Sequence, residues 1–480
     1  MLTTLIVLLP LVAAVVVWVV PLPREATAGL ALLVALAEVA LWIATLVRFD
    51  FGSSALQESA QREWFDDLGV SYHVGFYGFS LWLAGLTVVL GAAAIGFGTW
   101  AGRERPRAYF GLMLFLVGAV AGVFASQDLL LFYVCFEAML IPIYVLVGVW
   151  GGPGRIAATV TFVLYTMAGS LLMLAAVVAF GLSQGTFSLL DSGTSANDWV
   201  FLGFAVAFAV KAPLLPFHGW IRAAYTEAPP EVAALLSGVV SKAAVFGFVW
   251  IVLPHFPGPA DDWRTVILVL AALGLVYGSL LAFRQPDIRG VVAYSSLAQM
   301  SLITLGIFGA SDLGLDGAVL HSVSHGLVSG AMFLLAGMVI SRTGTDRFSE
   351  LGGMARGRPL LATTVMIVGM LTLAVPGSAN FAGEFAILAG VFGQGWGYAV
   401  VGAVAIVLAA MYTLRLISAV LHRAAGSAVR NETRDLGLAE LVVVLPLVLS
   451  LLALSAWPAA ISERSFPGDA PVSVISEAAR

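Results

Sequence analysis

Long apolar stretches, separated by short polar segments, run through almost the whole chain. A helix that crosses a bilayer needs about 20 mostly apolar residues. The sequence therefore predicts fourteen transmembrane helices, at about residues 2–20, 27–47, 79–100, 108–125, 129–150, 156–182, 200–221, 231–253, 265–283, 291–309, 315–340, 360–394, 397–421 and 437–460. The predicted fold is an all-α polytopic membrane protein. Its first stretch is expected to be retained, because it lacks the basic start and small-residue cleavage site of a signal peptide.

Two of the predicted helices contain residues that interrupt a helix. Pro213 and Pro216 closely follow Lys211 in the seventh, while Pro376 and Gly377 divide the twelfth, which is too long for one straight helix. Proline removes a backbone donor and clashes with the preceding turn. We therefore expect helices 7 and 12 to be broken, which is tolerated in a membrane where the break is packed in protein or lines a polar cavity.

The positions of the breaks predict an internal symmetry. They lie five helices apart, and a unit with an odd number of helices is followed by an upside-down copy, which is a recurring transporter design. The order thus favours two inverted five-helix repeats, helices 4–8 and 9–13. The expected divisions are residues 1–100 for helices 1–3, 101–255 and 256–425 for the two repeats, and 426–480 for helix 14 and a C-terminal tail.

Basic residues concentrate in alternate connections between the predicted helices. These connections carry Arg103, Arg105, Arg107, Arg155, Arg284, Arg289, Arg342, Arg347, Arg356, Arg358, Arg423, Arg430 and Arg434. The intervening connections carry Asp66, Asp67, Asp191, Asp198, Asp261, Asp262, Asp312 and Asp316. Because cytoplasmic connections are enriched in basic residues, both chain termini are expected on the outer side of the membrane.

The composition favours a membrane protein over a soluble one. Hydrophobic residues make up 60% and charged residues 11% of the chain, with a mean hydropathy of +0.99. Soluble domains carry about 25% charged residues. Cys135 is the only cysteine, which excludes intramolecular disulfides and cysteine-ligated iron–sulfur clusters. The net charge of −5 forms no basic tail, so nucleic acid is not an expected partner.

Lysine occurs at only two positions, Lys211 and Lys242, and both lie inside apolar stretches. A lysine at the centre of a bilayer costs at least about 2.5–3.5 kcal/mol, so it persists mainly where it pairs or lines a polar cavity. Unlike arginine, a lysine side chain can lose its proton when it is desolvated. The placement of the two lysines therefore indicates proton handling.

Glu137 in helix 5 has the opposite charge to Lys211 in helix 7. Pairing would keep the lysine protonated, and separation would leave a desolvated lysine that releases its proton. The two residues are therefore a candidate proton-release switch. The alternative is a structural ion pair that only holds the bundle together.

The other polar residues of the spans are Lys242 in helix 8, Gln299 in helix 10, His321 and His325 in helix 11, and Glu384 after the break in helix 12. The two histidines share one helix face and could bind a metal, but no third ligand is evident. His325 is the better candidate for a proton relay, with His321 as a helper or a packed polar residue. His218 either connects Lys211 to the inner water phase or only packs. Glu38 in helix 2 has three possible explanations. It faces a neighbouring subunit, it reaches the membrane–water interface because the helix is tilted, or it has a functional use.

Several of these residues stand in motifs that resemble the antiporter-like subunits of respiratory complex I. The motifs are FEAMLIP at 136–142, VKAPLLPFHGW at 210–220, the pair Ser241-Lys242, SHG at 324–326 and PGSANFAGEF at 376–385. The resemblance extends from about residue 105 to 425. Glu384 stands where chains L and N and the subunits of cation/proton antiporters typically carry a lysine, and this is the pattern of the chain M branch. Gln299 stands where the family typically has a histidine, and a glutamine cannot titrate.

The resemblance implies a proton-translocating subunit in the membrane arm of an NADH:quinone oxidoreductase of the bacterial plasma membrane. Glu137, Lys211, Lys242, His325 and Glu384 would form the proton relay, with His321, Gln299 and His218 in minor roles. NADH, FMN, iron–sulfur clusters and quinone are expected in partner subunits, with no cofactor or metal in this chain. Chains L and N, small subunits and lipids are the expected partners. The alternatives are a subunit of a cation/proton antiporter or of a membrane-bound hydrogenase, or a passive scaffold.

Overall fold

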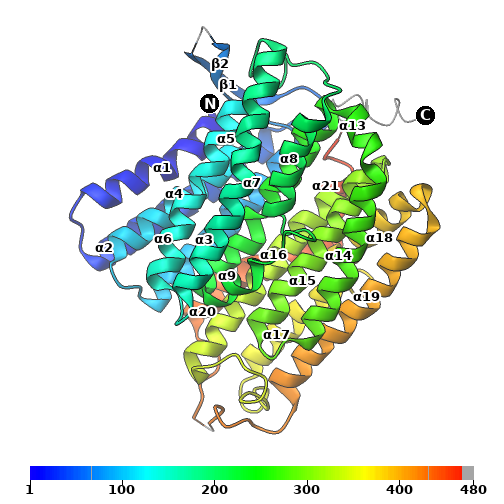
Figure 1. The fold of residues 1–480 in the computed structure, drawn as a ribbon. Coiled ribbons are helices and arrows are strands. Elements are labelled where there is room, and N and C mark those ends of the chain that lie inside the picture. The colour runs from blue at the N-terminus through cyan, green and yellow to red at the C-terminus, as the bar shows by residue number, and fades with distance from the viewer. Residues whose placement is uncertain (66–67, 431, 467–480) are drawn as a thin grey trace.

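A bundle of long helices dominates the computed structural model, which describes residues 1–65, 68–430 and 432–466 (Figure 1). Within these residues twelve helices are long and apolar enough to cross a membrane. They are α1 (Leu2–Val19), α2 (Arg24–Arg48), α3 (Gly78–Ala101), α4 (Pro106–Ala125), α5–α6 (Leu129–Trp150), α7 (Arg155–Gln184), the composite helix Pro230–His255, α14 (Arg264–Arg284), α15 (Ile288–Phe308), α16 (Asp312–Thr343), α19 with its continuation (Trp396–His422) and α20 (Leu438–Ala456).

The two remaining predicted helices are each divided into two shorter ones. Helix α8 (Asp198–Lys211) ends at the lysine, and the chain becomes helical again in α9 (Ile221–Glu227). Helix α17 (Pro359–Thr372) is separated from α18 (Ala379–Val391), whose first turn is capped by the Ser378 hydroxyl. Both predicted breaks are therefore present. The inverted repeats and the division into residue ranges stay predictions.

The predicted helical membrane fold is confirmed, with the addition of one pair of strands that was not predicted. Strands β1 (Gln57–Phe65) and β2 (Val70–Phe76) pair antiparallel in the connection between α2 and α3. In this connection β2 is mostly buried while β1 is largely exposed, so one strand packs against the protein and the other faces solvent. Asp66 and Asp67, which the sequence analysis assigned to an acidic connection, lie outside the described residues.

Two further irregularities were not predicted, and both lie next to polar residues of the bundle. Pro142 has no N–H to donate to the carbonyl of Ala138, and the helix is interrupted at Met139 between α5 (Leu129–Ala138) and α6 (Leu140–Trp150). The composite helix Pro230–His255 contains two π-helical segments, Leu236–Val240 and Phe248–Val252. Such segments are rare and frequently occur at functional sites.

The composite helix, α15 and α16 form the buried centre of the bundle, whereas α1, α2 and α19 lie at its edges (Figure 1). Gly238 and Gly326 allow the composite helix and α16 to touch backbone to backbone. A Cβ atom added to Gly326 would lie 2.6 Å from the carbonyl oxygen of Gly238. Small residues of this kind let transmembrane helices approach closely.

Buried ion pairs stabilise the end of the bundle at which the arginine-rich connections lie. Arg103 donates two hydrogen bonds to Glu231, at 2.6 and 2.7 Å, and Tyr109 donates a third at 2.6 Å. Arg342 forms a similar bidentate pair with Glu440. Bidentate arginine–carboxylate contacts are among the stronger polar contacts, and they add geometric specificity.

Candidate functional site

Lys242 makes the central contact of the polar residues. It begins the helical segment α11 (Lys242–Gly247), directly after the first π-helical segment, and is fully buried. Its Nζ atom lies 2.8 Å from the Ser237 carbonyl oxygen, 3.3 Å from the Ser241 hydroxyl and 2.9 Å from Nδ1 of His325. An ammonium has three protons to donate, so this environment suits a protonated lysine. His325 would then accept at Nδ1 and carry its own proton at Nε2.

A second set of contacts joins His321 to Glu384 through Gln299. His321 Nε2 lies 2.8 Å from the Gln299 side-chain oxygen, and the Gln299 amide donates to Glu384 at 3.2 Å. Three helices, α15, α16 and α18, supply these residues, which are all buried. Gln299, which cannot titrate, is therefore hydrogen-bonded on both sides.

The two sets meet on one face of α16. The rings of His321 and His325 have their centroids 6.1 Å apart, as expected for residues one helical turn apart. Within the part of the chain that the structure describes, His325 Nε2, His321 Nδ1 and Glu384 Oε2 have no hydrogen-bond partner. Buried polar groups usually have a partner, so these atoms are expected to bind water or to exchange protons.

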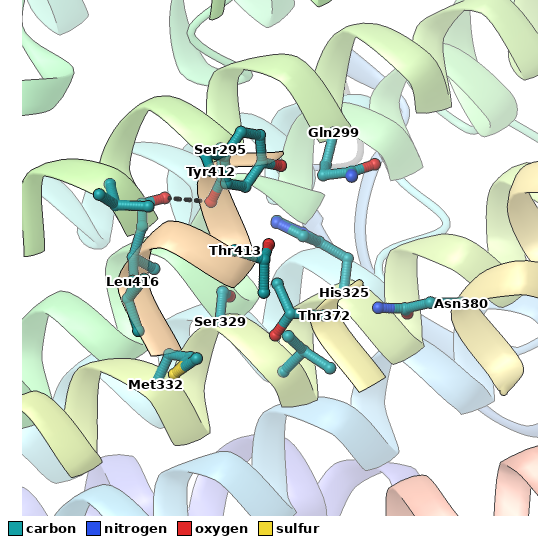
Figure 2. Close-up of a pocket in the computed structure, with 13 residues that line it drawn as sticks. Ser295, Gln299, His325, Ser329, Met332, Thr372, Asn380, Tyr412, Thr413 and Leu416 are labelled. Carbon is teal, nitrogen blue, oxygen red and sulfur yellow. Dashed lines mark hydrogen bonds between the residues drawn. The ribbon is translucent and has the colours of Figure 1, made fainter. Parts of the chain in front are cut away.

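A small cavity with both apolar and polar lining residues adjoins the site, and Figure 2 shows His325, Gln299, Tyr412 and Thr413 around it. The space open to the centre of a water-sized sphere is about 20 Å³. A water molecule needs about 10–15 Å³ by this measure and two to four polar partners. The cavity also presents atoms of Asn380, Tyr412 and Thr413 that have no partner among the described residues. It therefore fits a bound water next to His325.

Lys211 is buried but does not pair directly with Glu137. None of the ion pairs of the described residues joins the two side chains. The Lys211 ammonium lies instead over the ring of Phe136, 4.6 Å from its centroid, in a cation–π contact. Phe136 directly precedes Glu137 in α5, so the lysine lies on the aromatic neighbour of the glutamate. In this conformation the lysine contacts the aromatic ring.

The remaining candidates stand apart from these contacts. His218 lies in the segment after Lys211 and packs its ring against Tyr277, with centroids 5.3 Å apart. Glu38 is buried in α2, and neither of its carboxylate oxygens has a partner among the described residues. Hydrogen bonds thus join Lys242 with His325, and His321 with Gln299 and Glu384. Within the described part of the chain, these two sets have no hydrogen bond to Lys211, Glu137, His218 or Glu38.

Sequence reasoning missed the polar residues that line the cavity, chiefly Tyr412, Thr413 and Asn380. Tyr412 and Thr413 are buried in α19, a helix to which the sequence analysis assigned no function. Asn380 donates to the carbonyl oxygen of Leu371 at 3.0 Å and so connects the two halves of the broken helix. Adjacent polar residues inside an apolar span are the signal that could have identified the first two. Groups of three or more potential metal ligands are absent from the described residues.

The chain resembles known proteins along most of its length. A family model described as NADH:quinone oxidoreductase/Mrp antiporter, TM, matches residues 126–411. The NADH-quinone oxidoreductase subunit M of Mycobacterium tuberculosis (strain H37Rv) is 34% identical over 501 residues, with 94% of this chain and 90% of the relative covered. The subunit M of Rhodobacter capsulatus is 33% identical, with 96% and 94% covered. The chain belongs to the family of NADH-quinone oxidoreductase subunit M.

Solved structures agree with this assignment and confirm the resemblance found in the sequence. A chain in the structure of respiratory complex I from Thermus thermophilus with bound NADH is 31% identical, has a TM-score of 0.91 and covers 99% of both chains. A chain of the Mrp complex from Dietzia sp. DQ12-45-1b has a TM-score of 0.87 at 22% identity and so shares the fold. The residues of the two hydrogen-bonded sets all lie within the range matched by the NADH:quinone oxidoreductase/Mrp antiporter family model, and they are Lys242, Gln299, His321, His325 and Glu384.

Proposed function

We propose that the chain is a proton-translocating membrane-arm subunit of an NADH:quinone oxidoreductase, in which buried polar side chains carry the protons. The observation that carries this proposal is the pair of hydrogen-bonded sets, Lys242–His325 and His321–Gln299–Glu384, buried at the centre of the helix bundle. Ionisable residues in a membrane interior are expensive and mark proton or ion pathways. Membership of the subunit M family supports the identity of the complex.

The first part of the route is proposed to run from Lys242 to His325. The lysine loads a proton from the inner side, and its contact with Nδ1 makes the neutral histidine the acceptor. Histidine both donates and accepts, so it can release the proton held at Nε2. The adjoining cavity has space for a water that would accept it.

The second part of the route is proposed to end at Glu384. Gln299 cannot titrate, so its hydrogen bonds to His321 and Glu384 hold these two side chains in place while water carries the proton past it. Lys211 and Glu137 act as the switch of the proposed relay. Since the two do not touch in this conformation, direct pairing belongs to another state of the cycle, in which Lys211 leaves the ring of Phe136.

The chemistry of electron transfer is proposed to lie in other subunits. NADH oxidation, FMN, the iron–sulfur clusters and quinone reduction would belong to them, and this chain would have no redox activity alone. We place both termini on the outer side of a bacterial plasma membrane, with chains L and N, small subunits and lipids as partners. The arginine-rich connections support this orientation.

Replacing Lys211 with alanine tests the proposed switch in the assembled complex. We expect NADH-driven acidification of vesicles to fall at least about tenfold, since loss of one proton-transfer group typically costs 10²–10⁴ in rate. NADH oxidation with an artificial electron acceptor, which bypasses pumping, should stay within about twofold of the native complex. Lys211→Arg should also fail, because arginine keeps its proton.

Four results would contradict this assignment. Normal pumping by Lys211→Ala would leave the chain a passive scaffold, and normal pumping by Lys211→Arg would remove the proton-release switch. Sodium- or potassium-dependent transport without a redox donor would favour a cation/proton antiporter. Copurification with a hydrogenase would place the chain in that complex instead.

Gln299 offers a test of how the proton passes between His321 and Glu384. Gln299→His should retain pumping within about threefold, because a histidine can make both hydrogen bonds and can titrate. Gln299→Leu should reduce pumping by about tenfold or more, because it leaves two buried polar groups without their partner. Vesicle acidification by the two variants checks the prediction. If Gln299→His and Gln299→Leu pump equally well, Gln299 has no part in the route.

A further inference from the structure

A deep apolar groove lies between α2, α3, α16, α20 and the short helix α21 (Ala459–Ser462). The volume of the groove that the centre of a water-sized sphere can occupy is about 270 Å³. Its walls include Trp42, Trp82, Leu86, Leu327, Ala453 and Trp457. This groove is much larger than the small cavity beside His325 and shares no lining residue with it.

The groove is built into the packing of the helices. Gly85 has no side chain, and a Cβ added there would lie 2.3 Å from the Trp42 ring, so glycine lets this ring pack closely against α3. The Trp42 indole donates to the Leu81 carbonyl oxygen at 3.0 Å, which fixes its orientation. The small side chains of Ala453 and Ala460 leave the space between the aromatic walls unfilled.

The groove opens toward the surrounding bilayer and not toward the proton route. Leu327 lies two residues after His325, so the two side chains point to opposite faces of α16. Two of the residues that line the groove are themselves exposed, with Trp457 53% exposed and Ala453 of α20 also on the surface. An occupant must therefore be apolar and must come from the lipid phase.

A cation stands at one end of the groove. The guanidinium of Arg464 lies 4.6 Å from the ring centroid of Trp457, which lines the groove, and 5.1 Å from that of Phe51. Its own segment is held against α3, because the Phe79 N–H donates to the Ser465 carbonyl oxygen at 3.1 Å. Among the described residues Arg464 has no carboxylate partner. Tryptophan and arginine at the end of an apolar span are typical of the membrane–water interface.

We propose that this groove binds one acyl chain of an anionic membrane phospholipid, with its phosphate group against Arg464. The apolar walls accept the chain, and the guanidinium matches a phosphate in charge and geometry. Because lipid tails are as apolar as the helices, the chain alone gives little preference over the bulk bilayer. The contact with Arg464 therefore supplies the selectivity. This site is independent of the proposed proton route.

The test uses the assembled complex in vesicles that contain phosphatidylglycerol with a photoreactive diazirine near the end of one acyl chain. Illumination should attach the lipid to peptides of α3 and α20 that line the groove. Ala453→Phe fills the groove from an exposed position and should reduce this labelling at least about fivefold, which corresponds to about 1 kcal/mol by the relation of tenfold per 1.4 kcal/mol. Ala439→Phe, the same change at the other end of α20, is the matched control and should leave labelling unchanged.

A second pair of variants tests the contact between the lipid phosphate and Arg464. This pair also provides the test if the complex with Ala453→Phe does not assemble. Arg464→Gln should reduce labelling by about threefold or more, whereas Arg62→Gln, at an exposed position on β1, should not. A photoreactive residue placed at Ala453 should attach to lipid. Labelling that is equal in Ala453→Phe and Ala439→Phe, or in Arg464→Gln and Arg62→Gln, would overturn the proposal. Attachment of the Ala453 probe to a neighbouring protein would overturn it too, because a subunit would then fill the groove.

Discussion

Replacing Lys242 with methionine is expected to stop proton translocation by the assembled complex, with vesicle acidification reduced to at most about a tenth of the native rate. Methionine has a similar volume but no ammonium, so the packing of the bundle should be retained. The three acceptors around Nζ would lose their donor, and His325 would lose the group from which it takes a proton. Acidification and NADH oxidation measured on the same vesicles check the result.

Two companion variants separate the charge of Lys242 from its titration. Lys242→Arg keeps a cation that does not release its proton, so it should assemble normally and still fail to pump. Met338→Leu, a volume-conserving change at a buried position of the neighbouring helix α16, is the control for packing and should pump normally. Substantial pumping by Lys242→Met would remove Lys242 from the route.

The second large effect is expected on stability, for Glu231→Ala. Removing one partner of a buried ion pair is destabilising by about 3–5 kcal/mol, because the other charge is left uncompensated. Glu231 is fully buried, and it accepts hydrogen bonds from both Arg103 and Tyr109. Burial lowers the pKa of Arg103, but the Glu231 carboxylate more than offsets this and raises the pKa above its usual value. We expect a strong loss of assembled complex from membranes, measured by native electrophoresis, and a lower melting temperature.

A matched control uses an ion pair in which one of the two side chains is exposed to solvent. Asp261 pairs with Arg264 three residues later, and its side chain is 64% exposed. Exposed pairs contribute about 0–1 kcal/mol, so Asp261→Ala should change assembly little. The double variant Arg103→Leu with Glu231→Leu removes both buried charges and should recover part of the lost stability. Equal assembly of Glu231→Ala and Asp261→Ala would show that the buried pair does not hold the bundle together.

Much of the helical architecture could be predicted because the bilayer imposes simple requirements. Length and hydropathy locate the spans, and the chemistry of proline locates the breaks after Lys211 and before Ala379. The hairpin of β1 and β2 could not be predicted in this way, since its pairing depends on where it packs against the bundle. The π-helical segment before Lys242 likewise depends on neighbouring helices and leaves no composition signal.

The candidate site was predictable in its residues but only partly in its contacts. The cost of polar groups in a bilayer indicates that Lys242, His325 and Glu384 have polar neighbours, but hydropathy does not identify the neighbour. Glu137 is the clearest example, because its preceding residue, Phe136, contacts Lys211 in its place. Tyr412 was missed because a tyrosine in a span is often an interface anchor, whereas this one is buried beside the cavity.

The backbone contact between Gly238 and Gly326 has a consequence for the timing of proton transfer. It holds together the two helices that carry Lys242 and His325, whose polar atoms are 2.9 Å apart. A hydrogen bond is essentially lost beyond about 3.5 Å, so a slide of less than about 1 Å between these helices disconnects the two side chains. A small change in the position of one helix relative to the other therefore makes or breaks the hydrogen bond between Lys242 and His325. If protons follow the proposed route, a movement smaller than an atomic radius determines whether they can pass, and the reaction elsewhere in the complex would need only to supply that movement.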